Sequence, residues 1–360
     1  MLIIPVFIPH LGCPHDCVFC NQRSISGAQD LPTDEEIITQ IENYKKISEN
    51  YDEIQLAFFG GSFTAIPAEQ QEHFLRLVFP YVKKSGNKSA FIDSLRLSTR
   101  PDAIDEEVLE RLKRFGVSTI ELGAQSMDDK VLVLSGRGHK VSDTVKSSRM
   151  IKEKGFILGL QTMPGLPGST EEQDIETAEK IIALGPAIVR IYPTIVIKNT
   201  ALHKMMLLGK YTPMSLEDAV CLCAKLTRMY EDAGIKVIRT GLHSSENMCE
   251  DKDVAGGPYH PAFGDMVRSK ILIDELIPKI DKVIREKRDI SENFKADTLT
   301  IVVPSNMIST FTGNKKCNSK ALESKYGVKK VRFVPSAPDK NSSGNISENT
   351  VSGNDLTVYF

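Results

Sequence analysis

Short β-like runs alternate with amphipathic helical stretches through the first 240 residues of this 360-residue chain. Strands that alternate with helices in this way predict a parallel sheet whose strands are joined by crossover helices. The expected strands are residues 3–8, 54–59, 94–98, 118–123, 156–162, 187–192 and 236–240, and the helices between them include 33–44, 105–115, 141–154, 170–184 and 215–233. The pattern predicts an α/β fold with a partial or complete parallel (β/α) barrel, whose functional site lies where the strands end.

The remainder of the chain has a different character. Residues 244–261 contain Gly256-Gly257-Pro258 and are expected to form a loop, and residues 262–287 are expected to form a helix. Strand, helix, helix and strand patterns follow at 298–303, 305–312, 318–325 and 331–334, then a polar loop at 339–354 and a last strand at 356–360. The sequence therefore predicts three parts: a barrel at 1–243, a connecting loop and helix at 244–296, and a small basic α+β domain at 297–360.

Three cysteines crowd into eight residues after the first expected strand, in the run Cys13-Pro-His-Asp-Cys17-Val-Phe-Cys20. One loop with three thiolates can bind three irons of a [4Fe–4S] cluster and leave the fourth iron open to a small molecule, whereas electron-transfer clusters normally have four protein ligands. The chain has seven cysteines, an odd number that does not suggest a disulfide framework, and reduced thiols fit the cytoplasm. We expect Cys221 and Cys223 to be buried helix residues.

A zinc site is the main alternative for the cysteine run, with His10 or His15 as a further ligand. Structural zinc sites usually combine paired Cys-x₂-Cys arms from two places in a chain. No second arm is visible in this sequence. The spacing therefore favours the iron–sulfur interpretation.

Glycines and polar residues follow the next expected strands. Because the carboxyl ends of parallel strands meet at one edge of a sheet, we expect these residues to form one mouth. They are Gly60-Gly61-Ser62-Phe63-Thr64 after the second strand, Ser98-Thr99-Arg100-Pro101-Asp102 after the third, Glu121, Gln125 and Ser126 after the fourth, Gln161 to Gly168 after the fifth, and Tyr192-Pro193-Thr194 after the sixth.

The cysteine run, the Gly-Gly pair and the barrel together resemble the radical S-adenosylmethionine (SAM) superfamily. Within it, about residues 1–270 resemble the catalytic subunit of Elongator, a family that modifies the wobble uridine of tRNA. We expect the acetyltransferase domain of that family to have no counterpart here. The runs that carry this resemblance are Ser98-Thr-Arg-Pro-Asp, Glu121-Leu-Gly-Ala-Gln-Ser, Arg137-Gly-His, Met163-Pro-Gly-Leu-Pro-Gly-Ser and Tyr192-Pro-Thr.

This resemblance implies a [4Fe–4S] cluster bound by Cys13, Cys17 and Cys20, with SAM at the open iron. It implies reductive cleavage of SAM to a 5′-deoxyadenosyl radical, with a low-potential electron donor as a partner. Tyr192 and Lys198 are expected to face the substrate, and packing or solvation is the alternative for both. The cofactor contacts implied are Phe19 near the adenine, Gly60 and Gly61 near the methionine amino group, Arg137 near the carboxylate, Ser62 and Gln125 elsewhere on the cofactor, and Ser98 and Gln161 at positions that contact the ribose in relatives.

Residues 301–335 contain seven Lys or Arg residues and one acid, Glu323, in a chain of net charge −2. A local basic excess is the electrostatic footprint of polyanion binding. The order of strand, helix, Gly313-Asn314-Lys315-Lys316 turn, helix and strand resembles a KH domain, whose GXXG loop clamps the nucleic-acid backbone. Lys316 replaces the second glycine, so the motif is degenerate, and a solvated basic face is the alternative. The resemblance implies that Gly313, Lys315, Lys316 and Lys320 contact RNA.

We therefore expect the substrate to be RNA, either tRNA or rRNA. One alternative is a radical SAM enzyme that acts on a small metabolite or peptide, and another is a non-catalytic RNA-binding protein with a structural metal. No apolar run reaches the roughly 18 residues that cross a bilayer, so no membrane partner is expected. Residues 2–9 lack the basic segment and cleavage site of a secretory signal, which also favours the cytoplasm.

Overall fold

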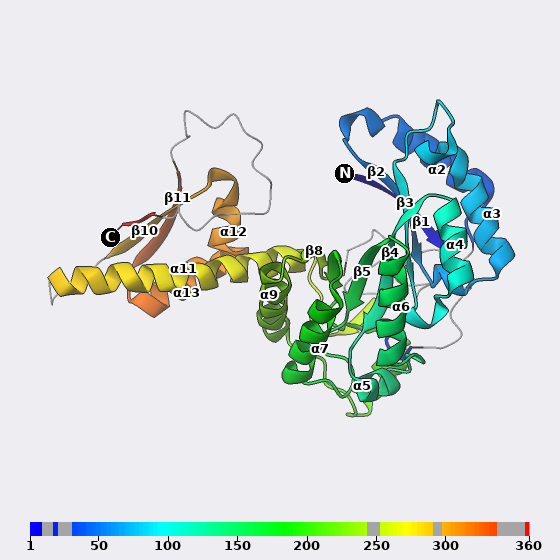
Figure 1. Ribbon diagram of the computed structural model, residues 1–360. Coiled ribbons are helices and arrows are strands. Elements are labelled where there is room, and N and C mark those ends of the chain that lie inside the picture. Colours follow the sequence, from blue (N-terminus) through cyan, green and yellow to red (C-terminus); the bar gives the residue numbers. More distant parts are fainter. Residues whose placement is uncertain (9–16, 21–30, 243–252, 291–296, 337–356, 360) are drawn as a thin grey trace. The chain divides into compact units, whose positions relative to one another are not determined.

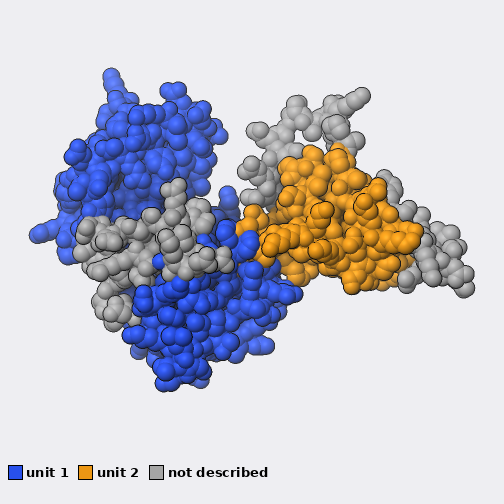
Figure 2. All heavy atoms as spheres, turned by 180° about the vertical axis from the view of Figure 1, so that it is seen from behind, with its two compact units in different colours: residues 1–261 blue, residues 262–360 orange. Residues whose placement is uncertain are grey.

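The computed structural model describes residues 1–8, 17–20, 31–242, 253–290, 297–336 and 357–359. The chain divides into two compact units, residues 1–261 and 262–360, which Figure 2 shows in different colours. Each unit has its own sheet. Within the described part of the chain, no helix has both the length and the apolar character needed to cross a membrane.

Seven parallel strands form the main sheet of the first unit, and their spatial order follows the sequence (Figure 1). Every expected strand is present, with bounds within two residues of the prediction, so the predicted parallel α/β fold is confirmed. Strands β1 and β8 form the two edges of this sheet, which makes the barrel a partial one. The strands are β1 (Leu2–Ile8), β2 (Ile54–Gly60), β3 (Ser94–Thr99), β4 (Val117–Gln125), β5 (Ile157–Thr162), β6 (Ile188–Ile191) and β8 (Lys236–Thr240).

Crossover helices connect these strands. The first of them begins as the sequence predicts, because Thr33 and Glu36 form a capping box in which each side chain accepts the other's backbone N–H. Ile37 and Ile41 lie four residues apart on one face of this helix and are buried. The helices are α2 (Asp34–Lys45), α3 (Ala68–Val78), α4 (Glu106–Arg114), α5 (Asp129–Leu134), α6 (Val141–Glu153), α7 (Glu171–Leu184), α8 (Ala201–Leu207) and α9 (Leu216–Asp232).

The main sheet curls so strongly that side chains from distant strands meet on its inner face. The guanidinium of Arg190 on β6 lies 5.4 Å from the ring centroid of Phe59 on β2. Strands β3, β4 and β5 lie between them. A flat sheet with a strand spacing of about 4.8 Å would place β2 and β6 about 19 Å apart. The inner face is therefore concave and filled by side chains at this level.

Two sequence expectations are wrong within the described residues. The stretch 244–261 was expected to be a loop, yet β9 (Val254–Gly256) pairs antiparallel with β7 (Val196–Ile197) in a separate sheet. Strands of two and three residues are too short to leave a periodic signal. Cys223 is buried on α9 as expected, but Cys221 is exposed. Residues two apart on an α-helix point about 200° apart, so one face cannot bury both.

The second unit packs one long helix, α11 (Phe263–Ile290), against a three-stranded sheet. Strand β10 (Thr298–Val303) pairs in parallel with β11 (Lys330–Pro335) and antiparallel with β12 (Thr357–Tyr359). Helices α12 (Ile308–Thr312) and α13 (Cys317–Tyr326) complete the predicted order of strand, helix, helix and strand. The predicted loop at 339–354 lies outside the described residues.

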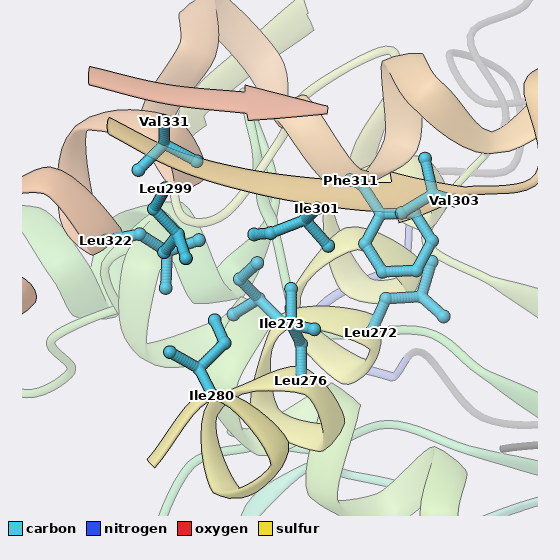
Figure 3. Packing of buried hydrophobic residues seen from close by; sticks show 10 residues of the cluster. All are labelled: Leu272, Ile273, Leu276, Ile280, Leu299, Ile301, Val303, Phe311, Leu322 and Val331. Carbon is cyan, nitrogen blue, oxygen red and sulfur yellow. The ribbon is translucent and has the colours of Figure 1, made fainter. Parts of the chain in front are cut away.

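Figure 3 shows the core of this unit, in which alternate residues of β10 pack against residues spaced four apart on α11. Every second residue of β10 is buried, and three α11 side chains at a spacing of four residues point toward them. The core consists of Leu272, Ile273, Leu276, Ile280, Leu299, Ile301, Val303, Phe311, Leu322 and Val331.

Candidate functional site

Residues 17–20 of the cysteine run form a turn that is fastened on both sides. The Cys20 amide donates to the Cys17 carbonyl at 3.0 Å. The Val18 amide donates to the Ser135 carbonyl at 3.0 Å, and the Val18 carbonyl accepts from the Leu202 amide at 2.7 Å. The turn is thereby held between the end of α5 and the start of α8, which brings Cys20 back toward Cys17.

Apolar packing shields the same turn. Phe19 and Val18 pack against buried Val196, Leu202 and Tyr211, and the Cys17 side chain is itself buried. Among the described residues, no group of three or more His, Cys, Asp or Glu could hold a metal. Cys13, His10 and His15 lie outside the described residues, so the structure describes two of the three predicted cluster ligands.

Gly60 and Gly61 bring the end of β2 onto the end of β1. Gly60 has a φ of +106°, and a Cβ atom there would lie 2.8 Å from the Ile8 carbonyl oxygen. The next amide, of Gly61, donates to that same oxygen at 2.8 Å. Only glycine fits both the left-handed backbone and the close approach.

Ser62 is buried just after β2 and connects two loops of the mouth. Its buried hydroxyl is 2.9 Å from the Thr99 hydroxyl and accepts the Arg100 amide at 3.0 Å. The Thr64 hydroxyl is 2.6 Å from Thr99 as well. These bonds tie the loop after β2 to the loop after β3, which gives Ser62 a supporting position.

Gln125 ends β4 in a conformation that non-glycine residues rarely adopt, with a φ of +67°. The pairing of β4 with β5 is irregular between Gly123 and Gln125, and the Met163 amide donates to the Gln125 carbonyl at 2.8 Å. Left-handed backbone at a non-glycine residue is strained and concentrates at functional sites. The Gln125 side-chain oxygen is buried, and no other described residue bonds to it.

Arg137 brings a fixed positive charge to the cysteine turn. Its side chain is only 7% exposed, its Nη2 donates to the Gly123 carbonyl at 2.7 Å, and its Nη1 points at the Cys17 sulfur at 3.5 Å. A Cβ atom on Gly123 would lie 2.7 Å from that Nη2 and 2.9 Å from the Gln125 amide nitrogen. The bare glycine backbone therefore gives these two side chains the room in which they meet.

Two buried polar atoms near the cysteine turn, one an acceptor and one a donor, have no hydrogen-bond partner among the described residues. Like the Gln125 oxygen, the Arg137 Nε is buried without a partner among the described residues. Buried polar atoms normally have partners, so such atoms point to a missing ligand. The amide oxygen accepts an N–H, and the Nε–H donates to an anion. The methionine end of SAM carries both an ammonium and a carboxylate, and it fits this pair.

An ion pair between buried Arg100 and partly exposed Asp102 fixes the backbone of Arg137. The Arg100 guanidinium donates twice to the Asp102 carboxylate, at 2.9 Å each, and once to the Arg137 carbonyl at 2.8 Å. Burial raises the pKa of Asp102, but Arg100 lowers it by more, so that the pKa of this carboxyl is below its ordinary value. Nearby, burial and then Arg137 lower the pKa of His139 to about 4, so that this imidazole is neutral at pH 7.

Deeper in the barrel, a charged network forms the floor of the mouth. Glu121 on β4 is 1% exposed. Arg96 on β3 donates to its Oε1 from Nε and Nη2 at 3.1 and 2.6 Å, and from Nη1 to Gln55 at 3.1 Å. Arg190 on β6 bonds both Glu121 oxygens. Burial raises the pKa of Glu121, but the two arginines together lower it by more than burial raises it. The carboxylate therefore stays ionised.

Ser98 and Gln161 are brought together above this floor, and the Gln161 amide donates to the Ser98 hydroxyl at 3.3 Å. Tyr192 directly follows β6 and is half-buried, with its hydroxyl 3.3 Å from Arg190 Nη1. Lys198 follows β7, which belongs to the separate two-stranded sheet, and its amide donates to the Asp253 carbonyl at 2.8 Å. Of the two predicted substrate residues, the structure thus joins Tyr192 to the floor.

Sequence reasoning missed Arg96 and Arg190 as site residues. Each is a single charge in the middle of an otherwise apolar strand, in Leu-Arg-Leu and Val-Arg-Ile. Charged side chains are almost never fully buried unless they are paired. An arginine inside an apolar strand was therefore the signal that the barrel interior is polar.

Asp174 on α7 fastens the loop that follows β5. Its carboxylate accepts the Gly165 amide at 2.9 Å and the Ser169 hydroxyl at 2.7 Å. Burial raises its pKa from 3.8 to about 6. The folded protein thus holds this proton over a pH range in which the unfolded chain releases it.

We expect the free energy of unfolding to fall as the pH rises from about 4 to about 6, because the folded state binds the Asp174 proton more tightly. The contribution is about 3 kcal/mol. The Asp174→Asn variant should lack this part of the pH dependence. Urea unfolding of both proteins from pH 4 to pH 7.5 measures this dependence. The free energy of unfolding of Asp174→Asn minus that of the wild type should rise with pH and level off above about pH 6. Parallel curves would contradict the prediction.

In the second unit, the Gly313-Asn314-Lys315-Lys316 segment forms an exposed turn between α12 and α13. Lys315 and Lys316 have φ values of +50° and +62°. Asn318 supports the turn, since its amide donates to the Phe311 carbonyl at 3.0 Å. The side chains of Lys315, Lys316 and Lys320 are exposed. The turn therefore presents three cations to solvent from a braced backbone.

Two protein-family models match this chain, and together they cover most of the first unit and the first residues of α11. A model described as the radical SAM superfamily matches residues 7–181. A second model, described as the radical SAM C-terminal domain, matches residues 186–272. The two matches together cover well over half of the chain.

Curated relatives are similar over the same region. A tRNA uridine(34) acetyltransferase from Methanocaldococcus infernus is 29% identical over 253 residues, 61% of this chain and 47% of that protein. An uncharacterized protein from Methanocaldococcus jannaschii is 34% identical over 221 residues, 58% of this chain and 65% of that protein. Human Elongator complex protein 3 is 29% identical over 52% of this chain and 37% of its own length. The chain spans about half the length of the curated relatives it matches.

A solved structure has the same fold. The archaeal Elp3 of Methanocaldococcus infernus superposes with a TM-score of 0.60 at 22% identity, covering 75% of this chain and 62% of that one. Together with the order of the seven strands, this similarity confirms the predicted barrel type.

Proposed function

Because this chain belongs to the radical SAM superfamily of enzymes, we propose that it cleaves SAM reductively at a [4Fe–4S] cluster and uses the product to modify an RNA. Cys13, Cys17 and Cys20 would bind the cluster, and SAM would complete its open corner. Bound together, the two cofactors supply a 5′-deoxyadenosyl radical after one-electron reduction of the sulfonium. The observation that carries the proposal is the buried Cys17 beside the open polar atoms of Gln125 and Arg137.

The residues of the mouth have separate tasks in this proposal. Arg137 Nε would donate to the SAM carboxylate, and the Gln125 oxygen would accept from its ammonium. Gly60 and Gly61 would let the backbone approach the same ammonium, while Ser62 supports their loop from beneath. Phe19 would line the adenine side, and Ser98 and Gln161 the ribose. The charged floor below would keep water out and would give Tyr192 a fixed position facing the substrate, with Lys198 as a second substrate residue.

The names of relatives and the exposed turn support RNA as the substrate. Two relatives are named for tRNA uridine(34) acetylation and for Elongator. A braced turn with Lys315, Lys316 and Lys320 offers cations to a phosphate backbone, as a KH-like domain at 297–360 would. We propose tRNA as the leading substrate class, a low-potential electron donor as a partner and the cytoplasm as the compartment, where thiols stay reduced.

Anaerobic reconstitution with iron and sulfide tests the enzymatic proposal. We expect a brown protein that releases 5′-deoxyadenosine from SAM when dithionite is added. A colourless protein that retains zinc would overturn the proposal and favour a structural metal. Mass spectrometry of nucleosides from cells that lack the protein then identifies the RNA product, and an unchanged nucleoside profile would favour a small metabolite or peptide as the substrate.

The double variant Lys315→Glu/Lys316→Glu should weaken tRNA binding and make it less dependent on salt. Each phosphate contact contributes about 0.9 to the slope of log affinity against log salt, so the loss of two contacts lowers the slope by about 2. Fluorescence anisotropy of labelled tRNA at several salt concentrations measures both quantities.

The matched control is Lys88→Glu/Lys146→Glu, which changes the net charge equally at two exposed lysines of the first unit. It should keep the wild-type slope. If the two double variants lose affinity equally, binding depends on net charge alone and the turn is not the RNA site.

A further inference from the structure

Arg137 contacts a predicted cluster ligand directly, in addition to any contact with SAM. Its Nη1 lies 3.5 Å from the Cys17 sulfur, within the range of an N–H···S hydrogen bond. The side chains of Arg137 and Cys17 are 7% and 8% exposed. An arginine remains charged at any ordinary pH, so the Cys17 sulfur has a permanent cation beside it.

The guanidinium is held in place before any cofactor binds. Its Nη2 donates to the Gly123 carbonyl at 2.7 Å, and the Arg137 carbonyl accepts from Arg100, which the Asp102 carboxylate orients. Gly123 leaves only enough room for this arrangement, because a Cβ atom would lie 2.7 Å from Nη2. The donor therefore requires no reorganisation when the cluster changes its charge.

We propose that Arg137 raises the reduction potential of the cluster bound through Cys17, in addition to its expected role near the SAM carboxylate. Potentials of iron–sulfur clusters depend on net charge and on hydrogen bonds to the sulfurs. Reduction adds a negative charge to the cluster, and a buried cation with an N–H directed at a ligand sulfur stabilises the reduced form more than the oxidised one. The inference rests on the proposed function for the presence of the cluster.

Different atoms of Arg137 serve the two roles, which makes them separable. Nη1 and Nη2 are engaged with Cys17 and Gly123, whereas Nε has no partner among the described residues. A contact with SAM can act only when SAM is bound. A change in the potential of the cluster in the absence of SAM therefore reports the contact with the sulfur alone.

The test is a redox titration of the reconstituted full-length protein without SAM, followed by electron paramagnetic resonance. In Arg137→Gln, the ratio of reduced to oxidised cluster at a fixed applied potential should fall about tenfold, which is a shift of about 59 mV to lower potential for a one-electron couple. Arg137→Lys, which keeps the charge but not the planar fork, should shift less. Gly123→Ala, which displaces the guanidinium, should shift in the same direction.

The control is Arg111→Gln, which removes another buried arginine, on α4, that bonds Gln71 and Glu107 and should leave the potential unchanged. A wild-type potential in Arg137→Gln, with or without weaker SAM binding, overturns the proposal. Should Arg137→Gln bind no cluster, wild-type potentials in both Arg137→Lys and Gly123→Ala overturn it. A wild-type protein that takes up no iron–sulfur cluster is a different result, which refutes the proposed function itself.

Discussion

Replacing Cys17 or Cys20 by alanine should give a colourless protein that no longer releases 5′-deoxyadenosine from SAM. Each variant removes one of the three proposed protein ligands, and thiolates are the groups that hold such a cluster. Loss of a residue that only supports a metal ligand already costs 10–100-fold in affinity or activity, so loss of a ligand should reduce SAM cleavage by more than about 100-fold. Iron analysis, the visible absorption spectrum and chromatography of the nucleoside product measure the outcome.

Cys221→Ala is the matched control, because its thiol is exposed on α9, outside the cysteine run. It should keep the colour, the iron content and the cleavage of SAM. Folding of the two cysteine variants can be verified by circular dichroism. A cluster that persists at wild-type content in Cys17→Ala would show that other ligands hold it, and would contradict the assignment.

The sequence predicted the strands of the main sheet well because each has a strong local signal. Apolar runs alternate with helical patterns throughout residues 1–240, and the helix expected at 33–44 is present as α2. The pairing of β7 with β9 was missed because its residues lie more than 50 positions apart and its strands are very short. Pairing between such segments depends on tertiary contacts, which no local pattern encodes.

The sequence predicts which residues meet at the site better than it predicts the direction in which each side chain points. Residues after strand ends do meet, as the contact between Arg137 and Cys17 shows. The direction of each side chain depends on packing that becomes visible only in the fold. The bonds of the Ser62 hydroxyl to Thr99 and to the Arg100 amide are an example. Likewise, nothing local could show that Arg190 reaches across the sheet to Phe59.

The floor of the barrel should contribute strongly to stability through one carboxylate. We expect Glu121→Gln to lower the free energy of unfolding by about 3–5 kcal/mol, because it leaves two buried guanidiniums without their counter-charge. Arg96 and Arg190 both bond to Glu121, whose side chain is 1% exposed. Urea unfolding at pH 7, followed by circular dichroism, measures the loss.

Glu107→Gln provides the comparison at the surface, because Glu107 also pairs with an arginine, Arg111 at 2.9 Å, but its side chain is 85% exposed. Exposed pairs contribute only about 0.2–1 kcal/mol. The two variants make the same chemical change, so the difference between them isolates burial. Equal losses in both variants would mean that water reaches the floor, and the barrel interior could then not exclude water from the mouth above it. A large loss confined to Glu121→Gln would instead identify the ion network as the part of the fold that holds β3, β4 and β6 in register beneath the site.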